Sequence, residues 1–77
     1  MPTAKETLNK LKWNEPGGLI RASVSYVHRG APNDEMTISG KDILELGNSF
    51  IQTKTAEIPY HRIFKITYEG ETVWTRH

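Results

Sequence analysis

The chain has 77 residues, of which 36% are hydrophobic and 25% charged, with a formal net charge of +1 and no cysteine. A chain this short makes one domain, residues 1–77, with a thin core, because so small a domain buries only about 60% of its unfolded surface. The composition excludes disulfides, thiolate metal sites and a global basic field that would bind nucleic acid indiscriminately.

The N-terminus and the hydropathy of the chain bear on where the protein acts. Residues 1–5 lead directly into a polar, helix-like segment, without the apolar run of a signal peptide. No stretch approaches the roughly 20 apolar residues that a membrane-spanning helix needs. We therefore expect a cytoplasmic protein with no membrane partner.

The first third of the chain predicts a helix followed by a strand. Thr3 and Glu6 have the spacing of a capping box, and Leu8 and Leu11 follow at helical spacing, so we expect a helix over about residues 4–12. Residues 14–18 are a turn by composition. Residues 19–28 alternate as a half-buried strand does, with the even-numbered side chains from 20 to 28 on one face.

The rest of the chain predicts short strands joined by turns. Residues 30–34 form a turn, residues 36–39 a short strand and residues 50–54 another, whereas residues 39–47 fit one helical turn or an extended segment about equally well. Residues 63–68 and 72–76 flank Glu69-Gly70-Glu71 and predict a C-terminal hairpin. We therefore predict an α+β fold, with a small antiparallel sheet or partly open barrel of about five short strands and an N-terminal helix.

Two His-Arg pairs are the main candidates for chemistry: His28-Arg29 and His61-Arg62, each beside a tyrosine at the end of a predicted strand. Arginine presents a planar fork of donors that suits phosphate, and histidine can donate a hydrogen bond or move a proton near neutral pH. The alternative is that each pair is an ordinary exposed strand end, paired with a carboxylate such as that of Asp34. The carboxylate of Asp42 is a second candidate partner for such a pair.

Aromatic side chains near these pairs are candidates for the core or for a ligand. We expect Trp13 and Trp74 to be core anchors, and Tyr26 and Tyr60 to suit either packing or contact with a ligand through the hydroxyl. Pro59 makes the residue before it extended and presents the following side chains rigidly. Exposed rings at such positions would stack on bases.

Other chemistries lack their sequence signatures. The three histidines, at positions 28, 61 and 77, have no i, i+3 or i, i+4 spacing, so we expect no metal site. No glycine-rich phosphate loop and no hydrolase triad spacing occurs, so we expect no cofactor. The sequence favours a binding protein over a stand-alone enzyme.

Four ordered segments resemble a family of small, mainly archaeal proteins, the RNA cyclic group end recognition domain. They are LKW (residues 11–13), YVHRG (26–30), IPYHRI (58–63) and VWTR (73–76), and IPYHRI is the most specific. The resemblance implies recognition of single-stranded RNA ends that carry a 2′,3′-cyclic phosphate, in RNA repair or end processing, with RNA-end-processing enzymes as partner proteins. The RNA- and phosphate-binding residues that it implies are Tyr26, His28, Arg29, Tyr60, His61, Arg62, Trp74 and Arg76.

Two other hypotheses stay open. In the first, the protein is a phosphodiesterase that acts on cyclic phosphate ends with His28 and His61 as acid and base. The 2H-type phosphoesterases that process such ends have Thr or Ser two residues after each histidine, whereas Gly30 and Ile63 stand there in this chain. In the second, the protein is a non-catalytic protein-interaction domain whose cationic pairs meet acidic partners.

Overall fold

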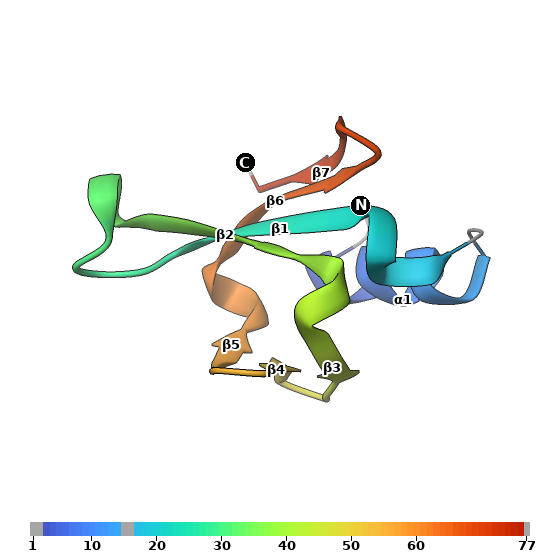
Figure 1. The fold of residues 1–77 in the computed structure, drawn as a ribbon, viewed down its shortest axis with the longest axis horizontal. Helices are drawn as coiled ribbons and strands as arrows, with labels where there is room; N and C mark the ends of the chain where they lie inside the picture. The colour runs from blue at the N-terminus through green and yellow to red at the C-terminus, as the bar shows by residue number, and fades with distance from the viewer. Residues whose placement is uncertain (1–2, 15–16, 77) are drawn as a thin grey trace.

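The protein, seen in a computed structural model that describes residues 3–14 and 17–76, has one α-helix and seven strands in two antiparallel sheets (Figure 1). The helix is α1 (Ala4–Asn14). The four-stranded sheet has the order β2-β1-β6-β7, and the three-stranded sheet has the order β3-β4-β5. The predicted α+β class is confirmed, with seven strands where about five were expected, and the two sheets in the described residues do not close into a barrel.

The strand bounds are as follows. The four-stranded sheet contains β1 (Ala22–Val27), β2 (Glu35–Ser39), β6 (Ile63–Tyr68) and β7 (Glu71–Thr75). The three-stranded sheet contains β3 (Ile43–Leu46), β4 (Phe50–Thr53) and β5 (Glu57–Pro59).

The capping box at the start of α1 is confirmed. The Glu6 N–H donates to Thr3 Oγ1 at 3.1 Å, and the Thr3 N–H donates to Glu6 Oε1 at 3.1 Å. These two bonds satisfy backbone donors that the first turn of a helix leaves without partners. Leu8 and Leu11 lie on the buried face, as predicted, and the helix continues two residues further than expected.

The prediction for Trp13 is wrong, because its side chain is 76% exposed. Trp13 lies on α1 rather than after it, and two residues of helix turn the chain by about 200°, which puts Trp13 opposite the buried Leu11. The ring lies 5.3 Å from Lys12 Nζ, in a cation–π contact at the surface. Trp74, by contrast, is half-buried and packs against the core.

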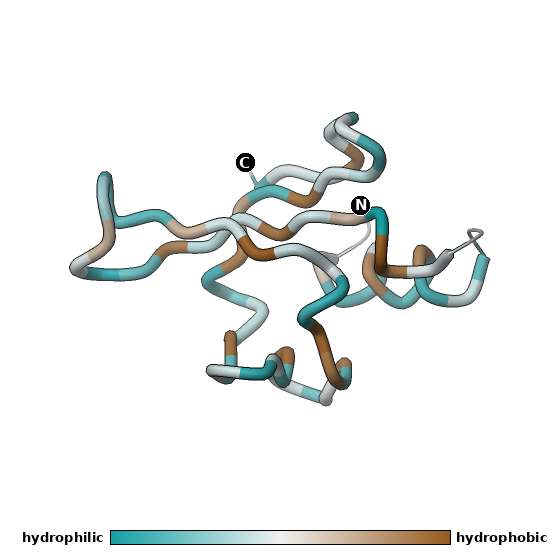
Figure 2. The backbone as a smooth tube through the Cα atoms, viewed as in Figure 1, coloured by the Kyte–Doolittle hydropathy of each residue, from teal (hydrophilic) through white to brown (hydrophobic). Residues whose placement is uncertain are grey.

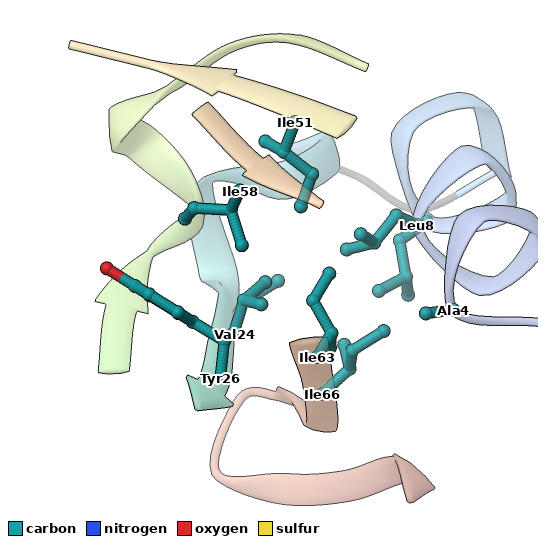
Figure 3. Packing of buried hydrophobic residues seen from close by; sticks show 10 residues of the cluster. Ala4, Leu8, Val24, Tyr26, Ile51, Ile58, Ile63 and Ile66 are labelled. Atoms are coloured by element: carbon teal, nitrogen blue, oxygen red, sulfur yellow. The ribbon is translucent and has the colours of Figure 1, made fainter. Parts of the chain in front are cut away.

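The core lies between the four-stranded sheet on one side and α1 with the three-stranded sheet on the other (Figure 3). In β1 the even-numbered Ala22, Val24 and Tyr26 are buried as predicted, but the odd-numbered Ser25 is buried as well, so the alternation is only partly seen in the burial pattern. Ile20 lies outside the strand, in the 3-10 turn η1 (Gly18–Arg21), and is exposed. The largest fully buried side chains are Leu8, Val24, Ile51, Ile58, Ile63 and Ile66.

Two short 3-10 turns carry the chain between the sheets (Figure 1). Turn η3 (Gly40–Asp42) joins β2 to β3, and turn η4 (Tyr60–Arg62) joins β5 to β6. We call them the two crossovers. The residues before them are similarly extended, with φ −79° and ψ 144° at Ser39 and φ −61° and ψ 139° at Pro59. Both readings of residues 39–47 are therefore partly correct, since the crossover η3 is followed by strand β3.

The predicted C-terminal hairpin is confirmed. Strands β6 and β7 pair with Tyr68 opposite Glu71, and the two residues between them, Glu69 and Gly70, have φ values of 51° and 85°. Positive φ at both central positions is what a type I′ hairpin turn requires. No helix in the described ranges is both long and apolar enough to cross a membrane.

Candidate functional site

The strand register brings the two His-Arg pairs to one end of the four-stranded sheet. Strands β1 and β6 are antiparallel, and their last pair on this side is Tyr26 opposite Ile63. His28 follows Tyr26 by two residues, and Arg62 directly precedes Ile63. The end of β1 and the start of β6 therefore lie side by side, and we call His28, Arg29, His61 and Arg62 the His-Arg end.

Backbone hydrogen bonds fix the first pair in the β1–β2 turn, which projects from the sheet and is largely hydrophilic (Figure 2). The His28 N–H donates to the Asp34 carbonyl at 2.8 Å, and the Gly30 N–H donates to Asp34 Oδ1 at 3.3 Å. The imidazole of His28 meets the Tyr26 ring edge-on, with 6.0 Å between centroids. The turn therefore has a fixed backbone and exposed His28 and Arg29 side chains.

The second pair lies in the crossover η4, which is held from two sides. On one side the Tyr60 hydroxyl donates to the Gly47 carbonyl at 2.8 Å, and the Tyr60 N–H donates to the Ser49 carbonyl at 3.2 Å. On the other side Arg76 donates to the His61 carbonyl and, through Nη2 at 3.1 Å, to the Tyr60 carbonyl. His61 and Arg62 thus project into solvent from an anchored backbone.

The predicted aromatic residues near the His-Arg pairs are buried or half-buried against the core. Tyr26 is 7% exposed, and its hydroxyl donates to Met36 Sδ, 3.8 Å away on the neighbouring edge strand β2. Tyr60 and Trp74 are half-buried against the core. Burial of the Tyr60 hydroxyl raises its pKa above the ordinary value of 10.0, so the phenol is neutral at physiological pH.

The carboxylates named as alternative partners of the pairs are engaged elsewhere. Asp42 lies 3.7 Å from Lys54 Nζ in an exposed ion pair, and Asp34 accepts from the backbone of Gly30. A further ion pair joins Arg21 and Glu69. Within residues 3–14 and 17–76, none of the four side chains of the His-Arg end takes part in an ion pair. Both guanidinium groups can therefore meet an external anion.

Sequence analysis missed one cation beside this site. Lys65 follows Arg62 by three residues in β6, and it lies opposite Ser25 on one side and Thr75 on the other. The pairing of β1 with β6 is the signal that would have found it, and that pairing links residues 40 positions apart in the chain. Among the described residues no cluster of three or more His, Cys, Asp or Glu is arranged to hold a metal ion.

Comparison with known proteins agrees with the resemblance of the four segments. A family profile, described as the MJ1316 RNA cyclic group end recognition domain, matches residues 1–76. A UPF0248 protein of Methanococcus maripaludis is 36% identical over 74 residues, which cover 94% of this chain and 96% of the relative. A UPF0248 protein of Archaeoglobus fulgidus is 36% identical over 70 residues, 90% of this chain and 99% of the relative. No solved structure matches the chain. With a profile match over nearly its whole length and relatives of this identity, the chain belongs to the RNA cyclic group end recognition domain family.

Proposed function

We propose that this protein is a small RNA-binding module that recognises RNA ends carrying a 2′,3′-cyclic phosphate, in RNA repair or end processing. The observation that carries the proposal is the shared location of two exposed His-Arg pairs at one end of the four-stranded sheet, with no ion pair from these side chains to any other described residue. The family description, which names RNA cyclic group ends, supports the same ligand.

Each residue has a role that follows from its chemistry. Arg29 and Arg62 bind the non-bridging phosphate oxygens through charge-assisted hydrogen bonds. His28 and His61 donate to the oxygens of the cyclic phosphate. Arg76 acts as a positioning residue, because its guanidinium already bonds the backbone of the crossover η4.

The aromatic residues support this arrangement. Tyr26 packs beneath the His28 ring and keeps it at the surface. Tyr60 and Trp74 are half-buried against the core, and in this proposal the exposed part of each ring contacts the terminal ribose or base. RNA-end-processing enzymes are the partner proteins that this role implies.

The test is binding of three matched RNAs that end in 2′,3′-cyclic phosphate, 3′-phosphate or 3′-hydroxyl, at one salt concentration. We expect the tightest binding for the cyclic end, with that end unchanged in the RNA recovered afterwards. An opened cyclic end would instead favour the phosphodiesterase hypothesis, since two histidines beside a phosphodiester can act as acid and base. Equal or absent binding to all three would overturn the proposal and favour an acidic protein partner.

A further inference from the structure

The four-stranded sheet has one covered and one open face. Helix α1 and the three-stranded sheet lie on the same side of it (Figure 1), where Leu8, Ile51 and Ile58 meet Val24 and Ile66 (Figure 3). In the part of the chain that the structure describes, no element lies over the other side. We call that side the open face.

The register places two rows of polar side chains across all four strands of the open face. Ser25 of β1 lies opposite Thr37 of β2 and Lys65 of β6, and Lys65 lies opposite Thr75 of β7. Ser25 is only 7% exposed, and its hydroxyl shares a hydrogen bond of 2.9 Å with that of the exposed Thr37. The members of this row that reach solvent are therefore Thr37, Lys65 and Thr75. This first row is the one nearer the His-Arg end, because Thr75 directly precedes Arg76 and Lys65 follows Arg62 by three residues.

The second row repeats the pattern one step further along the strands. Ser23 of β1 lies opposite Ser39 of β2 and Thr67 of β6, and Thr67 lies opposite Thr72 of β7. Across both rows every side chain is a hydroxyl except Lys65, and neither row contains a carboxylate. The nearest acid of the same face is Glu35, the first residue of the edge strand β2, which lies opposite Val27, one step from the first row toward the His-Arg end.

This chemistry complements a sugar-phosphate backbone. Serine and threonine hydroxyls both donate and accept, so they can bind phosphate oxygens and ribose 2′-hydroxyls, and lysine supplies a positive charge for phosphate. Such contacts orient a strand without reading its bases. An apolar partner or a hydrocarbon surface would leave the rows of hydroxyls without partners, which is unfavourable.

We infer that the open face binds the backbone of the single-stranded RNA that precedes the recognised end. The RNA crosses the first row at Lys65, and the terminal phosphate of the RNA reaches the His-Arg end. This inference rests on the proposed function and extends it from the terminal group to the body of the RNA.

The test compares Lys65→Gln with Lys10→Gln, which removes the same charge from the exposed side of α1. Binding is measured for a 2′,3′-cyclic mononucleotide and for a cyclic-ended RNA of about eight nucleotides, within the roughly 4–16 nucleotides that single-strand-binding folds cover. We expect Lys65→Gln to weaken octamer binding roughly five- to tenfold, the size of one lost phosphate contact. Mononucleotide binding should not change, and Lys10→Gln should match the wild type with both ligands.

A second pair of variants adds charge instead of removing it. Thr67→Glu places a carboxylate in the second row, whereas Thr55→Glu places one in the exposed β4–β5 turn, on the other sheet. We expect only Thr67→Glu to weaken octamer binding. Thermal unfolding of all four variants checks that each is folded.

The outcomes separate the two proposals. If Arg62→Ala abolishes mononucleotide binding while Lys65→Gln and Thr67→Glu bind the octamer as their controls do, the open-face inference is overturned and end recognition stands. If the wild type ignores the end group but its octamer binding depends on Lys65 and Thr67, end recognition fails and the open face stands. If the wild type binds neither ligand, both are overturned.

Discussion

At the scale of single residues, two exposed arginines beside the crossover η4 use the same side chain differently. Arg76 donates to the carbonyls of Tyr60 and His61, so its guanidinium holds the backbone of the turn. Arg62, within the turn, makes no ion pair in the described part of the chain. The first arginine therefore shapes the site and the second is available to a ligand.

This division of roles predicts distinct effects for Arg76→Ala. We expect the free energy of unfolding to fall by about 1–2 kcal/mol, because two hydrogen bonds from a charged donor are lost. Affinity for a cyclic RNA end should also fall, but its dependence on salt should not change, because no phosphate contact is removed. Urea unfolding and binding at several salt concentrations measure both effects.

The matched control is Arg21→Ala, which removes an exposed arginine whose partner is Glu69. Exposed ion pairs contribute about 0–1 kcal/mol, so this variant should be nearly as stable as the wild type and should bind RNA normally. If Arg76→Ala also reduced the salt dependence of binding, Arg76 would be a direct phosphate ligand instead.

The hydroxyl of Tyr60 gives a second prediction, on pH. Burial raises its pKa in the folded protein above 10.0, the ordinary value that the unfolded chain retains. Only the neutral phenol can donate to Gly47, so this contribution to stability is complete below pH 10 and is lost as the pH rises through the higher, folded pKa. Urea unfolding of the wild type and Tyr60→Phe from pH 8 to pH 11 measures it.

At neutral pH, Tyr60→Phe should lower the free energy of unfolding by about 0.5–1.5 kcal/mol, the contribution of one hydrogen bond. The gap between the two proteins should narrow above about pH 10, where the phenol of the unfolded wild-type chain begins to lose its proton while that of the folded protein still holds it. No gap at neutral pH would show that the hydrogen bond to Gly47 does not contribute to stability, and a gap that stayed constant up to pH 11 would contradict the raised pKa of Tyr60.

At the scale of elements, the two crossovers have the same shape but different surroundings. The first position of η4 is Tyr60, whose ring fills space beside the core, whereas the first position of η3 is the buried Gly40. A Cβ added at Gly40 would lie 1.7 Å from the Leu19 carbonyl oxygen. The crossover η3 therefore packs directly on the backbone of η1, and only glycine allows that approach.

Gly40→Ala should accordingly lower the free energy of unfolding by at least about 3 kcal/mol, because the backbone of either η1 or η3 must move. Gly30→Ala is the control: it has φ +95° but no atom within 4 Å of an added Cβ. We expect it to lose only about 1–2 kcal/mol, from backbone strain. Thermal or urea unfolding compares the two, and equal losses would contradict the close contact of the two turns.

How far the sequence predicted these elements depends on whether their causes are local. The capping box of Thr3 and Glu6 and the turn at Glu69-Gly70 depend on residues within a few positions of each other, and both were predicted correctly. The alternation of β1 needs only one strand and was also recognised. Sheet order depends on pairing between distant segments, so no local pattern revealed the two separate sheets.

The same distinction applies to the candidate site. The two His-Arg pairs were identified from their residue types, but their common location follows from Tyr26 pairing with Ile63 across 37 positions of the chain. The bond from Arg76 to the His61 carbonyl spans 15 residues, and it is the reason that we propose a positioning role for Arg76 in place of the expected ligand contact. The sequence did not mark Lys65 as a candidate site residue, because a single lysine in a strand is common and its neighbours are known only once the strands are paired.

At the scale of the whole molecule, the net charge is low, so the positions of the cationic side chains matter more for RNA binding than their number. The net charge is +1, so the protein has no long-range field to collect nucleic acid. In the proposals above, affinity for RNA comes from the few cations of the His-Arg end and the open face. Binding should therefore depend on salt only weakly, in proportion to the number of phosphates contacted.

This reasoning gives a prediction for Arg62→Ala. Each phosphate contact on a single strand contributes about 0.7 to the slope of log K against log salt, so contacts from Arg29, Arg62 and Lys65 give a slope of about −2 for the cyclic-ended octamer. Arg62→Ala should bring the slope to about −1.4 and weaken binding roughly 10- to 150-fold, as the loss of a charge-assisted hydrogen bond does. Titrations of both proteins between low and moderate salt measure slope and affinity together. A slope near −2 in the variant would mean that Arg62 touches no phosphate, whereas a wild-type slope several times steeper would mean that a broader surface than the one described binds the RNA.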